Sequence, residues 1–494
     1  MKLTEQILEI AKKYPERIAV EEREQSFTYR DLMAASAQIA KKINAEKLSN
    51  RPILVFGKND FLTLAAMIAS NLTGHAYVPV DAHTPFERAQ MILEGCQQSI
   101  VISTVALEAE FNQLFANKIS FIKFDKSTEF PEIDTSNAVS GEQADYIIFT
   151  SGTTGKPKGV EVNHDNLVTF TNWMNQDFCQ IEENHILSQA LYSFDLSIFS
   201  LYPALTTGGT LVSLSREETT NFKLLFERLN ASEINTWIST PSFVDICLLD
   251  PSFVQEKHPK LTQFIFCGEE LTVKTAQKLL KNFPDATIWN TYGPTEATGA
   301  ISVVKVTEEL VKNYSRVPLG VAKPGVELKI LENEIIIVGD SVANGYFENP
   351  QKTEEVFFEF DGKRAYRTGD AGFIDENGIV NYNGRIDFQV KFNGFRIELQ
   401  DIEAHLLALD DIDKAVVLAS ENEQHKVTGL VAICKTSVKF DDKKAEREFN
   451  KTIKAELSKS IMDYMQPTKF IYIDEFPLNQ NGKIDRKALE VLIG

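Results

Sequence analysis

A run of nine residues, Ser151-Gly-Thr-Thr-Gly-Lys-Pro-Lys-Gly159, holds the side-chain types with the clearest chemistry in this sequence. The apolar run Tyr146–Phe149 precedes it, which is typical of a strand that opens into a loop. Glycines let a backbone approach an anion closely, while hydroxyls, successive N–H groups and lysines supply donors and positive charge. The pattern predicts a loop that wraps a polyphosphate. It is not a Walker A loop, because no Gly-Lys-Ser/Thr stands in the required position.

Two charged side chains elsewhere stand in contexts that favour binding. Asp195 lies in the mostly apolar stretch Tyr192–Ser197. A desolvated carboxylate needs a cationic partner, because leaving one member of such a pair alone costs roughly 3–5 kcal/mol. A helix N-cap is the alternative explanation. Lys483 lies in a glycine-containing turn near the C-terminus, from which a long cationic side chain can enter a cleft, although a lone lysine is ordinarily a solvated surface charge.

The composition describes a soluble globular protein with at least two domains. Its 494 residues exceed one ordinary core, and 43% are hydrophobic against 24% charged. The net charge of −19 argues against nonspecific binding to nucleic acid or to anionic membranes. The amphipathic start Met1–Ile10 is not a signal peptide, and the apolar run Leu62–Leu72 is too short to insert across a bilayer. Five scattered cysteines without a CxxC pair indicate a reduced, cytoplasmic protein without structural zinc.

Strand-like and helix-like segments alternate up to about residue 380, which predicts an α/β fold with largely parallel sheets. The clearest predicted segments are strands at 52–57, 76–80, 210–214, 236–239 and 264–267 and a helix at 61–72. From Glu334–Gly339 onward, short strands such as Ile379–Asn383 and Asp387–Phe392 indicate a small β-rich subdomain.

The last hundred residues predict a compact α+β domain. Helices are expected at 399–409 and 443–460, and strands at 414–419 and 427–435. The joint with the preceding part falls near Gly384–Asp387, where a glycine and charged residues separate two strand-like runs. A hinge that absorbs a rotation has this composition, but so does an ordinary turn, and composition alone favours the turn.

Ten motifs run in order along the chain, and together they resemble those of the ANL superfamily of acyl-adenylate-forming enzymes. The motifs are Phe27–Leu32, Gly74–Asp81, Ser151–Gly159, Phe194–Ser197, Asn290–Glu296, Gly339–Tyr346, Tyr366–Asp370, Gly384–Glu398, Tyr464–Pro467 and Asn481–Arg486. The resemblance implies an acyl-adenylate synthetase fold. It has an N-terminal adenylation domain at 1–384, a hinge at 385–388, and a small mobile C-terminal domain at 389–494 that carries a catalytic lysine.

The same resemblance implies that ATP is a substrate. A carboxylate attacks the α-phosphate, so the protein must neutralise and position two anions that repel each other. The residues that resemble the ATP site of the family are Thr150, Ser151, Gly152, Thr153, Thr154, Gly155, Lys158, Asn290, Thr291, Tyr292, Gly293, Thr295, Asp370, Arg385 and Lys483.

Catalytic roles follow from the resemblance for three of these residues. Lys483 is expected to bridge the acyl carboxylate and the phosphate, Thr295 to donate to the α-phosphate, and Arg385 to lie on the ribose or phosphate side. Glu296 resembles the ligand of Mg²⁺, a hard cation that prefers carboxylate and phosphate oxygens.

Other positions of the family pattern are assigned in the same way. Tyr292 resembles the ring that lies against adenine, and Asp370 the carboxylate that binds both ribose hydroxyls. A buried tyrosine and a capping aspartate are the ordinary alternatives for these two residues. Asp387 resembles the hinge residue, and Gly394 and Arg396 lie in the motif that faces the pantetheine side during thioester formation.

The acid to be activated is indicated by Asp195. In amino-acid-adenylating domains, which this chain resembles, the matching aspartate holds the α-ammonium of the substrate. The segments Ser239–Phe243, Phe264–Glu269 and Asn290–Thr298 are similar to those of D-alanine–D-alanyl carrier protein ligases of Gram-positive bacteria. The resemblance implies a pocket for D-alanine.

Three further residues are assigned to that pocket. Cys267 corresponds to the side chain beside the substrate methyl, and Gly268 and Gly299 complete the set of substrate-binding residues. A thiol leaves room for a methyl but not for a branched side chain. A buried core cysteine is the commoner role of this residue type. The preference for the D enantiomer comes from the resemblance alone.

The acceptor is expected to be a separate protein. No Gly-x-Asp-Ser-Leu-type phosphopantetheine attachment segment follows Lys483. The resemblance implies a D-alanyl carrier protein that bears the thiol, with teichoic acids as the final acceptors of the D-alanyl esters.

Three alternatives remain open from the sequence. An acyl-CoA synthetase of the same fold is disfavoured by Asp195. An L-amino-acid adenylating enzyme for a peptide synthetase is the second alternative, because the sequence alone does not give stereochemistry. A catalytically silent nucleotide-binding or scaffold protein is disfavoured by the retention of Lys483, Asp370, Glu296 and the loop Ser151–Gly159.

Overall fold

The computed structural model describes residues 1–46, 51–97, 100–126, 128–152, 155–422, 426–478 and 484–493. The chain divides into two compact units. Unit 1 comprises Met1–Ala82, Gly95–Phe149 and Gly159–Gly384, and unit 2 comprises His83–Glu94, Thr150–Lys158 and Arg385–Gly494. Among the helices of the described ranges, none combines the length and the apolar character that crossing a membrane requires.

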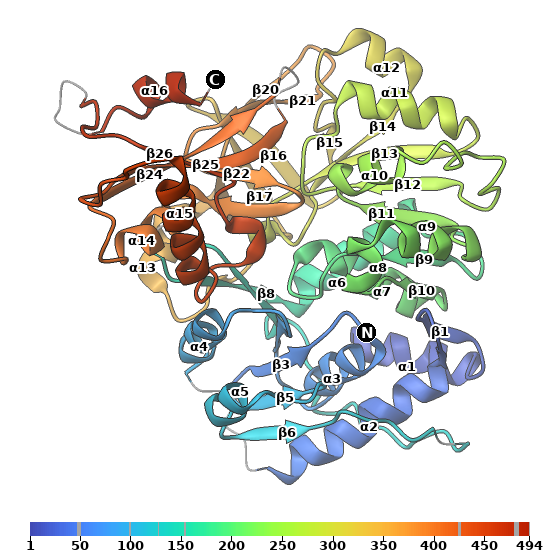
Figure 1. Ribbon diagram of the computed structural model, residues 1–494. Helices are drawn as coiled ribbons and strands as arrows, with labels where there is room; N and C mark the ends of the chain where they lie inside the picture. The colour runs from blue at the N-terminus through green and yellow to red at the C-terminus, as the bar shows by residue number, and fades with distance from the viewer. Residues whose placement is uncertain are drawn as a thin grey trace. The chain divides into compact units, whose positions relative to one another are not determined.

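A nine-stranded sheet is one of the sheets of unit 1 (Figure 1). From β1 through β10, β9, β11 and β12 to β13, neighbouring strands are parallel, while β2, β14 and β15 are antiparallel additions at the two edges. The strands are β1 (Ile18–Glu21), β2 (Ser26–Thr28), β9 (His185–Ser188), β10 (Thr210–Ser213), β11 (Thr236–Ser239), β12 (Gln263–Phe266), β13 (Thr287–Tyr292), β14 (Ser302–Val306) and β15 (Val321–Ala322).

A second sheet of seven strands has the order β18-β8-β7-β4-β3-β5-β6. Every residue of β3 and β4 is buried, as expected for short apolar runs in a parallel sheet that is covered on both faces. The strands are β3 (Ile53–Gly57), β4 (Tyr77–Asp81), β5 (Val101–Ser103), β6 (Lys118–Ser120), β7 (Ala144–Thr150), β8 (Lys158–Asn163) and β18 (Gly345–Tyr346).

Helices cover these sheets, and side chains at their N-termini explain where several of them begin. Thr28 and Asp31 form a capping box at α2, Asp60 accepts from the Thr63 N–H at α3, and Asn163 and Asn166 cap α6 reciprocally. The helices of unit 1 are α1 (Leu3–Lys13), α2 (Tyr29–Ala45), α3 (Phe61–Leu72), α5 (Ala109–Leu114), α6 (His164–Asp177), η1 (Asp195–Ser197), α7 (Ile198–Thr207), α8 (Arg216–Thr220), α9 (Phe222–Ala231), α10 (Pro241–Cys247), α11 (Val273–Asn282), η2 (Thr295–Ala297), α12 (Glu308–Asn313) and α13 (Pro350–Val356).

The predicted β-rich part of unit 1 is a five-stranded sheet with the order β16-β17-β20-β19 and β21 paired to β20. The pairs β16–β17, β17–β20 and β19–β20 are antiparallel. Its strands are β16 (Val326–Leu331), β17 (Glu334–Gly339), β19 (Phe357–Phe360), β20 (Lys363–Ile374) and β21 (Val380–Arg385).

Unit 2 has its own apolar core, to which Ile397, Ile402, Leu406, Leu430 and Leu457 contribute. A three-stranded sheet (β24-β25-β26) and a two-stranded hairpin (β22-β23) form its framework. Its elements are α4 (Phe86–Gly95), β22 (Gln389–Phe392), β23 (Phe395–Glu398), α14 (Leu399–Leu407), β24 (Lys414–Glu421), β25 (Val427–Lys435), α15 (Lys443–Leu457), η3 (Asp463–Met465), β26 (Lys469–Tyr472), α16 (Arg486–Leu489) and η4 (Glu490–Leu492).

The structure confirms the predicted α/β class with parallel sheets and reproduces the bounds of α3, β11, β17 and β25. The strand predicted at Asp387–Phe392 is wrong at its start, because β22 begins at Gln389 and Ile386–Phe388 form a bend. The side chain of Asp387 explains the difference, since its Oδ1 accepts from the Gln389 N–H at 3.1 Å and so turns the backbone before the strand begins.

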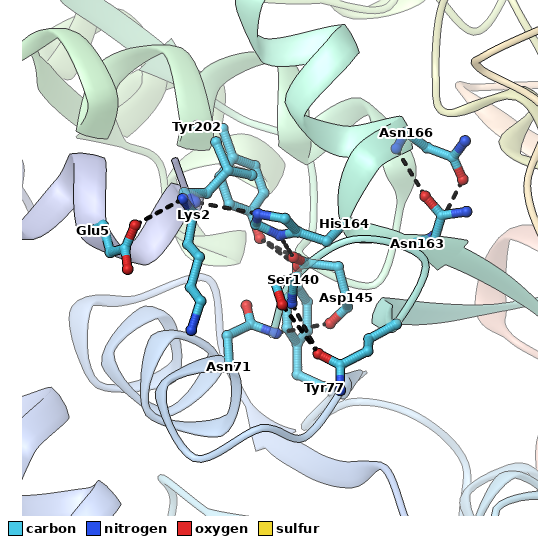
Figure 2. Close-up of polar contacts among 12 residues, drawn as sticks. Lys2, Glu5, Asn71, Tyr77, Ser140, Asp145, Asn163, His164, Asn166 and Tyr202 are labelled. Carbon is cyan, nitrogen blue, oxygen red and sulfur yellow. Dashed lines mark hydrogen bonds and ion pairs between the residues drawn. The ribbon is translucent and has the colours of Figure 1, made fainter. Parts of the chain in front are cut away.

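A buried polar cluster joins β7, α6 and the N-terminal segment of unit 1 (Figure 2). The Asp145 Oδ2 and the His164 Nδ1 lie 2.7 Å apart, and both side chains are buried. His164 Nε2 accepts from the Leu3 N–H at 3.3 Å, so Nδ1 carries the ring hydrogen and donates it to Asp145. Tyr202 also donates to Asp145. The cluster therefore joins the start of β7 to the start of α6. In the sequence, these two elements precede and follow the predicted phosphate-binding loop.

We expect His164→Leu to destabilise unit 1 by about 3 kcal/mol, because it leaves a buried carboxylate without its ring N–H while Tyr202 still donates. Asp145→Asn keeps an acceptor of the same shape and should cost less than half as much. Equilibrium urea unfolding of both variants measures the difference. Equal costs in the two variants would contradict the proposed role of the His164–Asp145 hydrogen bond.

Candidate active site

The predicted substrate residues of unit 1 lie at one edge of the nine-stranded sheet. Cys267 and Gly268 directly follow β12, and Tyr292 ends β13, its parallel neighbour. Asp195 lies on the segment that follows β9 in the same sheet. The carboxyl ends of neighbouring parallel strands meet at one edge, which is where ligands bind in α/β sheets. The topology therefore brings these residues, which are distant in sequence, to a common edge.

A tight turn after β13 carries Thr295 and Glu296. The turn contains the short helix η2 and passes through a left-handed residue, Thr298, at φ 60°. Gly293 is required here, because a Cβ at this position would lie 2.6 Å from the Gly299 carbonyl oxygen. Thr295 is buried, and Glu296 is fully buried.

Two carboxylates of this region are buried and each accepts from a tyrosine. The Tyr292 hydroxyl donates to Asp370 Oδ2, and the Tyr346 hydroxyl donates to Glu296 Oε1 at 2.8 Å. Asp370 is only 2% exposed, which leaves little water to solvate its charge. Hydrogen bonds to a buried carboxylate offset part of the cost of its desolvation. Both carboxylates are thus held in defined positions.

Asn290 and Thr291 bond to neighbouring backbone. The Asn290 Nδ2 donates to the Pro318 carbonyl at 2.9 Å, and the Thr291 hydroxyl donates to the Phe266 carbonyl at 2.8 Å. These bonds hold β13 to β12 and to the segment before β15. The two side chains therefore support the turn that follows them.

Asp195 is the first residue of η1 and is partly exposed. The N-cap residue of η1 is Phe194, so the structure does not favour the N-cap explanation for Asp195. The charge of Asp195 acts on Tyr146, whose pKa is raised well above its ordinary value, chiefly by burial and then by the nearby carboxylate of Asp195.

Cys267 is buried in the core of unit 1, and its thiol donates to the Gly299 carbonyl with a sulfur–oxygen distance of 3.7 Å. A Cβ on Gly299 would lie 2.9 Å from the Phe199 ring, so glycine lets α7 approach. Gly268 has φ +91°, a conformation that favours glycine. These contacts place the Cys267 thiol beside the Gly299 carbonyl.

The predicted phosphate-binding loop belongs to unit 2. The Ser151 hydroxyl donates to the Arg396 carbonyl at 3.2 Å and accepts from the Glu398 N–H at 3.0 Å. Lys158 Nζ lies 3.8 Å from Glu398 Oε1. The loop is closed on itself by the Gly155 N–H, which donates to the Gly152 carbonyl, and by the Thr150 hydroxyl, which contacts the Lys158 carbonyl. Thr153, Thr154 and Lys483 lie outside the described residues.

The predicted hinge holds a local ion pair. Arg385 Nε donates to Asp387 Oδ1 at 2.8 Å, and a second guanidinium nitrogen donates to Oδ2. Burial alone would raise the pKa of Asp387, but the hydrogen bonds and charge of Arg385 outweigh burial and hold this pKa below its ordinary value. Gly394 has φ +85° in the turn of the β22–β23 hairpin, and Arg396 follows in β23, paired with Lys391.

Comparisons with known proteins match both the sequence and the fold of this chain. Residues 7–347 match the AMP-binding enzyme family, and residues 401–483 match the AMP-binding enzyme C-terminal domain. A protein of Lactococcus lactis named D-alanine–D-alanyl carrier protein ligase is 68% identical over 491 residues, which cover 99% of this chain and 98% of that protein. A Streptococcus agalactiae protein of the same name is 43% identical, over 94% of this chain and 93% of its own.

The chain belongs to the AMP-binding enzyme family, and within it to the D-alanine–D-alanyl carrier protein ligases.

Solved structures of low sequence identity share the fold. The adenylation domain AlmE of Vibrio cholerae, solved with glycyl-adenosine-5′-phosphate, has a TM-score of 0.83 at 20% identity, covering 99% of this chain and 97% of its own. A double mutant of the o-succinylbenzoate CoA synthetase of Bacillus subtilis has a TM-score of 0.85 at 19% identity, covering 98% of each chain. This likeness confirms the acyl-adenylate synthetase fold.

The donor set around Glu296 fits a magnesium ion that arrives with a nucleotide, the substrate that adenylate-forming enzymes share. Mg²⁺ is usually bound by one or two carboxylates together with phosphate oxygens rather than by a cage of protein ligands. Among the described residues, no group of three or more His, Cys, Asp or Glu side chains could hold a metal ion. A single, fully buried carboxylate with one oxygen held by Tyr346 is the kind of ligand such a site requires.

A buried charged cluster in unit 2 was not predicted from the sequence. Arg88 Nη1 on α4 lies 3.8 Å from Asp401 Oδ2 on α14, and His405 Nε2 lies 3.6 Å from Asp401 Oδ1. Burial raises the pKa of Asp401 to about 6, against the lowering effect of Arg88. Burial also lowers the pKa of His405, as does the charge of Arg88. Nothing in the spacing of α4 and α14 along the chain signals this pair.

The pKa of Asp401 predicts how the stability of unit 2 changes with pH. The pKa of Asp401 is higher in the folded state than in the unfolded state. Its contribution to the free energy of unfolding is therefore fully present below its ordinary pKa of about 3.9 and is lost as the pH rises through about 6. From about pH 4 to about pH 6.5 the native protein should lose on the order of 2 kcal/mol relative to Asp401→Asn. In Asp401→Asn, Arg88 faces an amide, which costs stability. This cost does not depend on pH and so does not change the predicted pH dependence.

Hydrogen exchange of the β24 and β25 amides across this pH range measures the effect. Parallel pH dependences in the native protein and in Asp401→Asn would show that Asp401 does not titrate there.

Proposed function

We propose that this chain activates D-alanine with ATP and transfers the D-alanyl group to a separate D-alanyl carrier protein. The proposal is supported most strongly by the 68% identity, over 99% of the chain, to a protein that bears this name. In the first step the D-alanine carboxylate attacks the α-phosphate, forming D-alanyl-adenylate and releasing pyrophosphate. In the second, the phosphopantetheine thiolate attacks the acyl carbon, forming a thioester and releasing AMP.

Asp370, Tyr292, Thr295 and Glu296 are proposed to position the nucleotide and its metal ion. Asp370, held by Tyr292, binds the ribose hydroxyls, and the Tyr292 ring lies against adenine. Thr295 donates to the α-phosphate, and Gly293 shapes the turn that presents it. Glu296 holds Mg²⁺, which when bound neutralises phosphate charge and so reduces repulsion of the attacking carboxylate.

The phosphate contacts are proposed to come from the loop Thr150–Lys158, Arg385 and Lys483. The N–H groups and hydroxyls of Thr150–Gly155 and the charge of Lys158 bind the β- and γ-phosphates. Arg385 binds on the ribose or phosphate side, and Lys483 bridges the substrate carboxylate and the α-phosphate. Positioning and charge compensation account for the rate in this scheme, because the protein forms no covalent bond with the substrate.

Asp195 selects an amino acid by pairing with the α-ammonium of D-alanine. Cys267, between Gly268 and the carbonyl of Gly299, limits the space beside the substrate methyl. A pocket difference of about one methylene gives roughly 1–3 kcal/mol of discrimination. This pair of residues is proposed to determine the substrate class and the size limit.

The two half-reactions are proposed to use different orientations of residues 389–494 relative to residues 1–384, with the hinge at residues 385–388 centred on Asp387. In the second half-reaction, the thioester formation, Gly394 and Arg396 face the pantetheine arm. We place the reaction in the cytoplasm, where ATP is available, and take it as the first step of the D-alanylation of teichoic acids.

The first test is ATP–pyrophosphate exchange with D-alanine, L-alanine, D-serine, glycine and acetate. D-Alanine should be the best substrate, and Asp195→Asn should reduce kcat/KM for D-alanine by about 100-fold or more with ATP binding little changed, because the ion pair with the α-ammonium is lost. Undiminished use of D-alanine by Asp195→Asn would remove the reason for assigning it to the ammonium. A preference for acetate would instead indicate an acyl-CoA synthetase.

Lys483 is proposed to act only in adenylation. Lys483→Ala should abolish pyrophosphate exchange, because the charge between the two reacting anions is lost, yet largely preserve transfer to the carrier from pre-formed D-alanyl-adenylate. Single-turnover transfer measured beside exchange separates the two steps. Equal loss of both would contradict this role.

A further inference from the structure

The segment Gly339–Phe347 matches a family motif, yet none of the proposed catalytic steps uses it. It connects β17 to β18 and continues toward α13. Within unit 1 its polar groups bond to several elements, among them α6 through Asn166, the turn that carries Glu296, and β8.

Three hydrogen bonds join the segment to the Glu296 turn. The Ala343 N–H donates to the Glu296 carbonyl at 2.9 Å, and the Thr298 hydroxyl donates to the Ser341 carbonyl at 2.8 Å. The third is the bond of 2.8 Å from the Tyr346 hydroxyl to Glu296 Oε1. Both the backbone and the carboxylate of Glu296 are therefore held by the same segment.

The same segment is anchored to β8. Gly345 and Tyr346 pair antiparallel with Glu161 and Val160. The Asn344 N–H donates to the Glu161 carbonyl at 2.9 Å, and the Phe347 N–H donates to the Gly159 carbonyl at 2.8 Å. Because these are backbone bonds within a sheet, they give the segment a fixed register.

The Tyr346 side chain has little freedom to move. It is 6% exposed, and its ring lies edge-on to the Phe357 ring with centroids 5.5 Å apart. Its own N–H donates to the Thr353 hydroxyl at 2.9 Å. A hydroxyl fixed in this way defines where Glu296 Oε1 lies. A phenylalanine would fill the same space without fixing the carboxylate.

We infer that Tyr346 is a positioning residue for the metal-binding carboxylate. Its hydroxyl sets the orientation of Glu296 before the nucleotide arrives. The segment Gly339–Phe347, which is paired with β8, holds that hydroxyl in place. The inference rests on the proposed function of Glu296 as the Mg²⁺ ligand. Groups that orient a metal ligand typically contribute 10- to 100-fold in metal affinity.

The test measures ATP binding by calorimetry at a series of Mg²⁺ concentrations. D-Alanine is left out so that no turnover occurs. Tyr346→Phe should raise the Mg²⁺ concentration that gives half-maximal ATP binding by about tenfold or more, with metal-free ATP binding unchanged. Tyr29→Phe is the matched control. It removes another buried hydroxyl, which donates to the Ala204 and Gly209 carbonyls at positions distant in sequence from Glu296, and should leave the titration unchanged.

Glu296→Gln separates this inference from the proposed function. If Glu296→Gln shifts the Mg²⁺ titration and Tyr346→Phe does not, Glu296 keeps its metal role and the positioning role of Tyr346 is wrong. If neither variant shifts it, the metal role of Glu296 itself is wrong. A shift in both, with melting temperatures of Tyr346→Phe and Tyr29→Phe lowered alike, supports the inference, because a purely structural tyrosine would change stability without changing Mg²⁺ dependence.

Discussion

A carboxylate that leaves water must find donors inside the protein, and this constraint links elements of unit 1 that are far apart in sequence. Asp145 takes its donor from His164, Asp370 from Tyr292, and Glu296 from Tyr346. Each bond crosses from one element to another, so the charges cannot be placed independently of the fold. The same bonds that stabilise the buried charges also fix the groups that we propose to meet ATP and Mg²⁺.

This arrangement suits a reaction whose main obstacle is electrostatic. When two anions must be brought together, rigid and correctly oriented charges are worth more than reactive side chains, because they need not reorganise during the reaction. The turn at Thr295–Ala297 follows β13 directly, and hydrogen bonds join it to the segment Gly339–Phe347. In unit 2, charges are held in pairs such as Arg385–Asp387 and Arg88–Asp401.

The sequence predicts well those features that local pattern determines. The bounds of α3, β11 and β25 follow from apolar runs of the right period and length. The bend before β22 was missed, because it depends on the side chain of Asp387 accepting from the backbone. Arg88–Asp401 and Tyr346–Glu296 were missed for a different reason, since each joins residues that only the tertiary fold brings together. The proposed site residues came from motifs, and periodicity alone would have left Tyr292 and Asp370 as ordinary buried residues.

The most direct measurement of the proposed function is intact-protein mass spectrometry of a D-alanyl carrier protein bearing phosphopantetheine, incubated with this chain, ATP and Mg²⁺. With D-alanine the carrier should gain one alanyl group that hydroxylamine releases, as expected for a thioester, and AMP should form in equal amount. The gain should be much slower with L-alanine and absent with the carrier that lacks phosphopantetheine. A carrier that stays unmodified while free CoA becomes acylated would contradict the proposed function.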